Sequence, residues 1–233
     1  MGKTCSVISY GAKGDGDSDD TAAFQRAFDA CSDGHGAVLI EEGTFLITAT
    51  ITSNASSVDV RGVGEGSLLL WADAGDLFSW TQPVSMMLVA DFAVASVGMP
   101  KPLNATALRF HADCTKSSFE NLQFIGAGSV STPHGTRDTH LLGTCMDLGP
   151  VTDTVEVRGC LLWFLAGTGI AIGRGSEVRI EGGRIIGAGV RNDSSVGIHV
   201  RGNNGGVHIE GTDVIGLHIG IMLKDTLGVG SNR

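Results

Sequence analysis

The sequence predicts an all-β fold, a parallel β-helix of about seven coils, and three observations indicate it. Glycine occupies 35 of 233 positions and proline only 5, which suits many tight turns and disfavours a helical bundle. Short apolar alternations recur along most of the chain, with starts at residues 58, 87, 117, 155, 178 and 207. A second short strand ends six or seven residues before each start. Two strand registers that stay locked together in this way favour a solenoid over a β-sandwich.

The N-terminal region is predicted to form an α-helix that closes one end of the solenoid. Asp19, Asp20 and Thr21 supply capping side chains at its start. Because a solenoid must cover its open end, we expect a single β-helix domain over residues 1–233. It divides into a cap region (1–36), coils (37–225) and a tail (226–233). The apolar residues of the helix recur at helical spacing before Gly34, and they are Ala23, Phe24, Ala27, Phe28 and Cys31.

The repeat is clearest in three five-residue copies, VEVRG at 155–159, VRIEG at 178–182 and VHIEG at 207–211. Alternation within each copy sends every second side chain to the same face. Alignment of the copies therefore predicts which outward side chains stack from one rung to the next, where a rung is one level of the solenoid. The longest interval, 38 residues before position 155, predicts an insertion at about residues 126–143.

The N-terminal sequence resembles the signature of a known superfamily. The segments VISYGAKGDGDSDDTAAFQRA at 7–27, GTFLI at 43–47 and GVG at 62–64 are similar to the start of the pectate-lyase-like right-handed β-helices. The resemblance is close over the first 70 residues and extends loosely to residue 225. It implies a right-handed helix and a carbohydrate partner, without choosing between lyase, glycoside hydrolase, epimerase and phage tailspike depolymerase. It also implies an extracellular or virion-associated location and makes a homotrimer one expectation.

Composition and spacing exclude several other classes of protein. A net charge of −9 argues against a binder of duplex nucleic acid, and no apolar run approaches the roughly 20 residues of a membrane helix. The five cysteines show no zinc-site spacing, and we expect buried thiols. The run from Asp15 to Asp19 resembles the start of a calcium loop, but Asp20 and Arg26 replace the required glycine and glutamate. We therefore predict neither a metal nor a cofactor.

One pair of outward columns carries charges of alternating sign. The columns run Asp59, Leu88, Ser118, Glu156, Arg179, His208 and, beside them, Arg61, Ala90, Glu120, Arg158, Glu181, Glu210. Most of these residues predict a solvated ladder of salt bridges. The exception is Glu181 next to Glu210, because a like charge raises the pKa of one carboxyl, as a general acid requires. Adjacent rungs would place the two carboxyls about 5 Å apart, as in retaining glycosidases, which makes them the alternative catalytic pair.

The outward columns of the other strand gather positive charge within an acidic protein. They contain Arg109, His111, Asp147, His199, Arg201 and Lys224, with Gly149, Ala171 and Gly173 between them. Arginine pairs planar carboxylates through two hydrogen bonds. This surface is therefore predicted to bind an anionic polysaccharide such as a uronate polymer, with Arg201 and Lys224 among the substrate-binding residues.

The same surface offers groups for β-elimination. That reaction needs a cation to hold the uronate carboxylate and a base to remove the adjacent proton. Arg109 is the candidate cation, and His111 or His199 is the candidate base. Asp147 is predicted either to orient a histidine or to pair with Arg109.

The insertion at 126–143 leads directly into the strand of Asp147 and is predicted to project from the solenoid as a loop. If it folds over the basic surface, Arg137 and His140 join the substrate-binding residues. Among the tryptophans, Trp80 aligns with the inward Ile172 and is predicted to lie in the core. Trp71 and Trp163 lie near turns, where they could stack on sugar rings.

Taken together, these features favour a protein that binds and cleaves an acidic polysaccharide. β-Elimination is preferred over hydrolysis because the basic surface is better populated than the carboxylate pair. The alternative is a non-catalytic β-helix module, such as a phage tail fibre segment or an adhesin. In both cases the partner is a polysaccharide, not a nucleic acid or a membrane.

Overall fold

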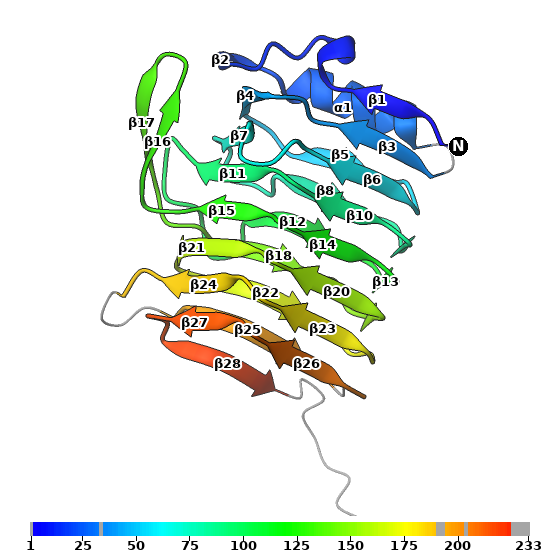
Figure 1. Cartoon of the computed structure of the whole chain (residues 1–233), viewed down its shortest axis with the longest axis vertical. Helices are drawn as coiled ribbons and strands as arrows, with labels where there is room; N and C mark the ends of the chain where they lie inside the picture. The colour runs from blue at the N-terminus through cyan, green and yellow to red at the C-terminus, as the bar shows by residue number, and fades with distance from the viewer. Residues whose placement is uncertain (1, 33–34, 190–193, 203–204, 225–233) are drawn as a thin grey trace, which may run out of the picture.

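The computed structural model describes residues 2–32, 35–189, 194–202 and 205–224. The chain winds as a right-handed parallel β-helix with three long sheets stacked along its axis (Figure 1). We call them sheets A, B and C, and a full coil passes through C, then A, then B. The all-β solenoid predicted from the sequence is confirmed. The predicted tail, residues 226–233, lies outside the described residues.

Sheets A and B each contain eight described strands and sheet C contains seven. Sheet A comprises β1 (Thr4–Ser6), β3 (Gly36–Leu39), β6 (Val58–Arg61), β10 (Leu88–Ala90), β14 (Ser118–Glu120), β20 (Val155–Arg158), β23 (Val178–Glu181) and β26 (Val207–Glu210). Sheet B comprises β2 (Asp15–Asp19), β4 (Gly43–Ile47), β7 (Ser67–Trp71), β11 (Ala93–Ser96), β15 (Gln123–Ile125), β21 (Leu161–Leu165), β24 (Arg184–Gly187) and β27 (Asp213–Ile215). Sheet C comprises β5 (Ile51–Ser53), β8 (Phe78–Trp80), β12 (Thr106–Phe110), β18 (Thr144–Asp147), β22 (Thr168–Ile172), β25 (Val196–Arg201) and β28 (Ile219–Lys224).

Shorter elements lie between the long sheets. A short parallel sheet joins C to A and contains β9 (Val84–Ser85), β13 (Cys114–Thr115) and β19 (Thr152–Asp153). An antiparallel hairpin of β16 (Gly128–Thr132) and β17 (Gly135–Thr139) follows β15. It occupies the predicted insertion and rises beside sheet B toward β2 (Figure 1).

The rung register predicted from the repeat is confirmed in sheet A. Inward residues that pair from rung to rung are Val60, Val89, Phe119, Val157, Ile180 and Ile209. In sheet C the prediction holds from β8 to β28 but is wrong at the first rung, where Thr52 and not Thr50 pairs with Ser79. The connection from β5 to β6 lacks a strand of the short sheet and is shorter than the three connections that contain β9, β13 and β19.

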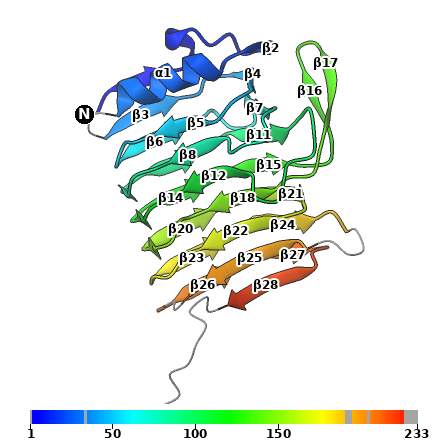
Figure 2. The same ribbon diagram turned by 180° about the vertical axis from the view of Figure 1, so that it is seen from behind.

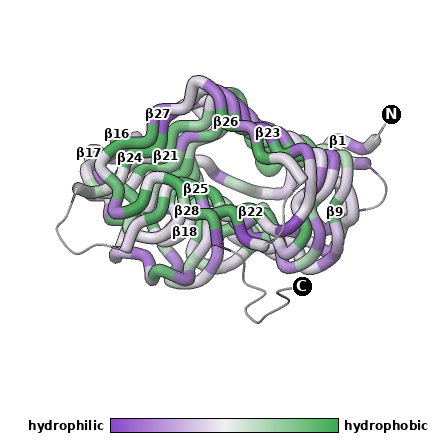
Figure 3. Tube along the Cα trace, turned by 90° about the horizontal axis from the view of Figure 1, so that it is seen from below, coloured by the Kyte–Doolittle hydropathy of each residue, from purple (hydrophilic) through white to green (hydrophobic). Residues whose placement is uncertain are grey.

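The interior is apolar and rich in aromatic rings. Trp80 is fully buried, as predicted, and stacks on Phe110 with ring centroids 4.5 Å apart. Phe78 lies beside Trp80 and contacts Phe28 of the cap at 5.4 Å. Viewed along the axis from the C-terminal end, the sheets enclose this interior (Figure 3). The core thus joins the cap to the coils.

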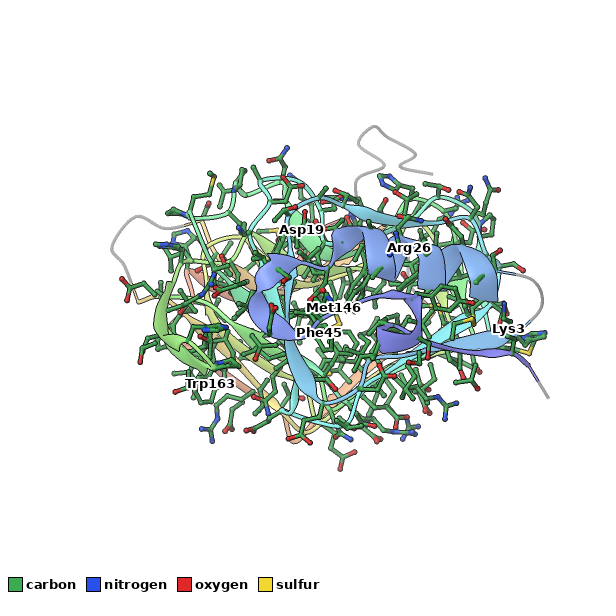
Figure 4. The ribbon with its side chains drawn as sticks, turned by 90° about the horizontal axis from the view of Figure 1, so that it is seen from above. Lys3, Asp19, Arg26, Phe45, Met146 and Trp163 are labelled. Atoms are coloured by element: carbon green, nitrogen blue, oxygen red, sulfur yellow. A yellow bond between two sulfur atoms is a disulfide. The ribbon has the colours of Figure 1, made fainter. Side chains whose placement is uncertain are left out.

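The helix α1 (Thr21–Cys31) lies across the N-terminal end of the solenoid (Figure 4). Its predicted apolar face is buried, and Phe24 packs edge-on against Phe45. Asp20 sits at the N-cap position but accepts hydrogen bonds from the backbone N–H groups of Lys13 and Gly14. Asp19 instead accepts the bond from the Thr21 N–H. A 3-10 turn, η1 (Ile8–Tyr10), precedes this region.

Two of the cysteines are not thiols, which corrects the prediction for them. Cys5 on β1 and Cys31 at the end of α1 form a disulfide that ties the cap to the first rung. Cys114, Cys145 and Cys160 are free and buried, as expected, and burial raises the pKa of the Cys114 thiol to about 12. None of the helices in the described residues is long and apolar enough to cross a membrane.

Candidate functional site

The residues of the predicted basic surface lie on strands of sheet C or directly after one, and these strands can be followed in Figure 2. Arg109 pairs in register with Asp147, Asp147 with Ala171, and Ala171 with His199. Arg201 lies in register with Lys224, which belongs to the last described rung. The predicted register therefore places these residues correctly on one face, and their roles depend on the contacts they make.

Arg109 is engaged by the protein itself. Its Nε donates to Asp76 at 2.6 Å and its Nη1 to Asp147 at 3.4 Å. Its Nη2 donates to the Asn104 carbonyl and to the Thr106 hydroxyl. All three guanidinium nitrogens have partners and the side chain is only 20% exposed. That Arg109 holds a substrate carboxylate stays a prediction, and these contacts do not favour it.

Asp147 links two arginines that lie on different rungs. Arg201 donates to both carboxylate oxygens of Asp147, and it also donates to the Gly149 carbonyl at 3.1 Å. The intervening strand β22 presents the small Ala171, followed by Gly173, so the long Arg201 side chain can cross it. Of the two predicted roles for Asp147, pairing with Arg109 is the one observed.

The two histidines differ in their surroundings. His111 Nε2 lies 3.1 Å from the Ser79 hydroxyl. Burial lowers the pKa of His199 below its ordinary value, and the positive charges of Arg201 and Lys224 lower it further. His199 Nε2 is buried without a hydrogen-bond partner in the described residues. The lowered pKa favours the neutral form of His199, and burial shields its Nε2 from ligands.

The alternative carboxylate pair lies on sheet A, where Glu181 and Glu210 are in register on adjacent rungs. Arg179 Nη1 donates to Glu181 at 3.0 Å and Arg158 Nε donates at 3.4 Å. These arginines hold the pKa of Glu181 below its ordinary value, whereas the prediction required a raised pKa. Glu210 contacts His208 at 3.2 Å. A lowered pKa at Glu181 disfavours the protonated acid that hydrolysis needs.

The hairpin does not fold over sheet C. Val130 packs with Leu70 and Ala95 on the outer face of sheet B, and Arg137 forms an ion pair with Asp17 of β2. The backbone N–H of His140 donates to the carbonyl of Ser96 on sheet B. The prediction that Arg137 and His140 join the basic surface is therefore wrong, because apolar burial directs the hairpin to the other side.

The two tryptophans predicted to stack on sugar rings differ in their exposure to solvent. Trp71 is fully buried, so it cannot stack on a sugar, and that prediction is wrong. Lys101 Nζ lies over the Trp71 ring at 5.1 Å and donates to the Val97 carbonyl at 3.1 Å. Trp163 is 40% exposed and lies on the outer side of the molecule, whereas Phe45 points inward (Figure 4).

Burial of Lys101 predicts a pH dependence of stability. Burial lowers the pKa of Lys101 to about 8, below its pKa in the unfolded chain. Between these two pKa values the unfolded chain binds more protons than the folded chain does. The free energy of unfolding should therefore rise with pH over this window. We expect Lys101→Met to abolish this rise, which urea unfolding at several pH values measures.

Lys13→Met, at an exposed lysine, is the matched control and should keep the slope of the wild type. Equal slopes in Lys101→Met and in the wild type would contradict the assignment of this pH dependence to Lys101.

A groove that the sequence did not reveal crosses four rungs of sheet A. It lies where β14, β20, β23 and β26 begin and has a volume of about 890 Å³. Its hydroxyl groups come from Ser118, Thr154 and Ser176, among others. Its charged or titratable side chains are Lys116, Glu156, Glu177, Arg179 and His208. We call this hollow the sheet A groove.

The turn into sheet A creates the groove. Lys116, Thr154 and Glu177 each adopt a left-handed backbone, with φ of 49°, 54° and 55°. Each lies one or two residues before a sheet A strand, so the sharp turn recurs from rung to rung. With a rung spacing of about 4.8 Å, four rungs span roughly 14 Å. Non-glycine residues rarely adopt positive φ, so nothing in the residue types at these positions predicts the concavity.

Two of the charged side chains in the sheet A groove form ion pairs with neighbouring residues. Glu156 pairs with Arg158 at 2.6 Å, and Arg179 pairs with Glu181. Asp153, just outside, accepts hydrogen bonds from the Ser176 N–H and hydroxyl, which lower the pKa of Asp153 below its ordinary value. The groove therefore mixes hydroxyl donors with fixed positive and negative groups.

Comparisons with known proteins identify the fold. Residues 4–70 match the family model described as rhamnogalacturonase A/epimerase, pectate lyase-like. The solved structure of the pre-mature bacteriophage phi29 gene product 12 matches 94% of this chain and 33% of its own, with 16% identity and a TM-score of 0.50. The fold is a right-handed parallel β-helix, and residues 4–70 are similar to pectate-lyase-like proteins.

Other solved structures are similar to this chain at lower identity and lower TM-score. The Acinetobacter baumannii phage AM24 tailspike protein has 11% identity and a TM-score of 0.39, and the match covers 100% of this chain and 49% of that one. The Streptococcus pneumoniae surface protein and adhesin PfbA has 12% identity and a TM-score of 0.41, with 96% and 97% covered. This chain thus spans a third of the phi29 protein and half of the tailspike. No curated protein sequence matches it.

The β-helix places the predicted site residues on different faces. Sheet C carries Arg109, His111, Asp147, His199, Arg201 and Lys224, whereas Glu181 and Glu210 lie on sheet A and Arg137 and His140 lie beside sheet B. Within the described ranges, no three His, Cys, Asp or Glu side chains gather where they could hold a metal ion.

Proposed function

We propose that this chain is a carbohydrate-binding β-helix that holds an acidic polysaccharide in the sheet A groove without cleaving it. The observation that carries the proposal is the shape and lining of the groove. It is elongated along the solenoid and presents hydroxyl and charged groups on three successive rungs and His208 on the fourth. A chain of sugars offers hydroxyls at regular intervals and can follow such a groove. A location outside the cell or on a virion, where such polymers occur, forms part of the proposal.

The positive groups of the groove favour an acidic polymer. Lys116 lies at the turn into β14, and the described residues give it no ion pair closer than 4 Å. Arg179 is half exposed, so its guanidinium can contact a ligand in addition to Glu181. Hydrogen bonds from such cations to carboxylates are stronger than those between neutral groups.

Binding without cleavage agrees with the state of the predicted catalytic groups. Arg109 and Asp147 are held in ion pairs with the protein. Glu181 has a lowered pKa, which disfavours a general acid. These groups therefore maintain the scaffold, and the proposal assigns them no chemical step.

Substitutions in the groove test the proposal. We expect Lys116→Gln and Arg179→Gln each to weaken binding of polygalacturonate or alginate by about ten- to a hundredfold, since a charged hydrogen bond contributes about 1.5–3 kcal/mol. Isothermal titration calorimetry at two salt concentrations measures the loss, which should shrink at high salt. Lys13→Gln on the cap is the matched control and should bind as the wild type does. Unchanged affinity in both groove variants, or equal affinity for neutral dextran, would contradict the proposal.

A second candidate function, β-elimination on sheet C, is favoured by His199. This neutral histidine lies near Arg201 and Lys224, and a neutral imidazole beside cations can remove a proton next to a uronate carboxylate. The test is release of unsaturated uronate, read by ultraviolet absorbance, from the wild type and from His199→Asn. Release that depends on His199 would establish the lyase, and its absence in the wild type would leave the binding function alone.

A further inference from the structure

An apolar column runs down the outer face of sheet B. Residues paired from rung to rung are Leu46, Leu70, Ala95, Ile125, Trp163, Ile186 and Ile215. The equivalent outer column of sheet A carries charged groups on most of its rungs. Because outward side chains of a solenoid normally face water, seven apolar residues in succession indicate a face that is meant to be covered.

The hairpin covers the N-terminal part of this column. Val130 packs with Leu70, Ala95 and Val97, and Leu46 and Ile125 lie against the same cluster. The covered stretch shows that the outer face of sheet B binds apolar protein side chains. It also ends abruptly, because the hairpin rises toward β2 and away from β24 and β27 (Figure 1).

The rest of the column is exposed. Trp163 is 40% exposed and Ile215 51% exposed, with Ile186 partly exposed between them. Phe164 adds a second exposed ring, because a register shift after Trp163 and a φ of 57° at Phe164 interrupt the alternation of β21. We call Trp163, Phe164, Ile186 and Ile215 the sheet B patch.

We propose that the sheet B patch is the surface through which this chain associates with a second copy of itself. The patch continues the same apolar column against which the hairpin packs. Its apolar side chains are therefore of the kind that contact other protein side chains. Burial of apolar surface contributes about 25 cal/mol per Å², which favours such an association.

Charges at the border of the patch also suit a second copy. Arg184 and Asp213 lie in the neighbouring outward column and pair at 3.1 Å, and both are half exposed. In an isologous contact the same surface meets itself. A border that carries both signs can do so with opposite charges adjacent, whereas a border of one sign would repel its copy.

The oligomeric state of the full chain tests the proposal. We expect the wild type to sediment as an assembly larger than its 24.1 kDa monomer at micromolar concentration. Trp163→Glu and Ile215→Glu should raise the dissociation constant at least a hundredfold, with unchanged circular dichroism because both side chains are exposed. Val63→Glu, at another exposed apolar residue (56% exposed), is the matched control and should associate as the wild type does.

Two further measurements distinguish this contact from end-to-end association and from polysaccharide binding at the patch. Leu223→Glu alters the last described strand, so association lost there but kept in Ile215→Glu would overturn the proposal in favour of end-to-end contact. Trp71 and Trp80 are fully buried, so acrylamide quenching reports on Trp163 and should fall as protein concentration rises. A monomeric wild type at all concentrations, or protection of Trp163 by polysaccharide alone, would also overturn it.

Discussion

Gly173→Ala is expected to lower the free energy of unfolding by about 3 kcal/mol or more, because the added methyl group meets backbone. A Cβ at Gly173 would lie 2.5 Å from the carbonyl carbon of Pro150, and still closer to the carbonyl oxygens of Pro150 and Gly149. Rung spacing cannot relax, since the Arg174 N–H donates to the Pro150 carbonyl at 3.0 Å. Thermal unfolding should show a decrease in Tm of roughly 6–12 °C.

Gly66→Ala is the matched control for this substitution. A Cβ at Gly66 would lie 3.4 Å from the side chain of Glu42, which is ordinary contact. Neither Gly66 nor Gly173 has a positive φ, so the two variants differ in space and not in backbone strain. Equal Tm values for the two variants would show that the coils can separate at Gly173, contrary to the close packing described.

Asp147→Ala is expected to destabilise the protein by about 2–3 kcal/mol, because it leaves two arginines without the carboxylate between them. Asp147 is only 17% exposed, and Arg109 and Arg201 both donate to it. Urea unfolding measures the loss. The double variant Asp147→Ala/Arg201→Ala should lose less than the sum of the two single variants, since one positive charge is removed with the carboxylate.

An exposed ion pair provides the control for Asp147. Arg61 pairs with Asp59 at 2.6 Å but is 51% exposed, so Arg61→Ala should cost no more than about 1 kcal/mol. Asp147→Ala should also leave polysaccharide affinity unchanged if the ligand occupies the sheet A groove. A stability loss in Asp147→Ala no larger than that in Arg61→Ala would refute the scaffold role of the sheet C ion pairs.

Much of the fold could be predicted because strand alternation has a strict period. A shift of one residue would expose every apolar side chain of a strand, so Val157, Ile180 and Ile209 allow only one alignment of their rungs. The first rung of sheet C was misplaced at Thr50, since connection lengths vary and only pairing reveals them. The disulfide between Cys5 and Cys31 was also missed, because neither residue carries a local sign of its partner.

The candidate site was predicted only in part. Placement of Arg109, Asp147 and His199 on one face followed from register and is correct. Their roles did not follow from register, because Arg109 donates a hydrogen bond to Asp76, a residue outside the aligned columns. Long charged side chains form ion pairs with the opposite charges nearest to them in space. Which charges are nearest depends on the connections between strands, and the repeat does not describe those connections.

Apolar periodicity and the cap signature were enough to specify the solenoid, its register beyond the first rung of sheet C and its N-terminal helix, because periodic burial of apolar side chains fixes which residues align. Contacts between rungs were needed to establish that Arg201 reaches Asp147 across Ala171, that Val130 directs the hairpin to sheet B, and that left-handed turns hollow the sheet A groove. The physical reason is that apolar periodicity acts along the chain, whereas ion pairs, loop docking and turn conformation depend on neighbours from other rungs.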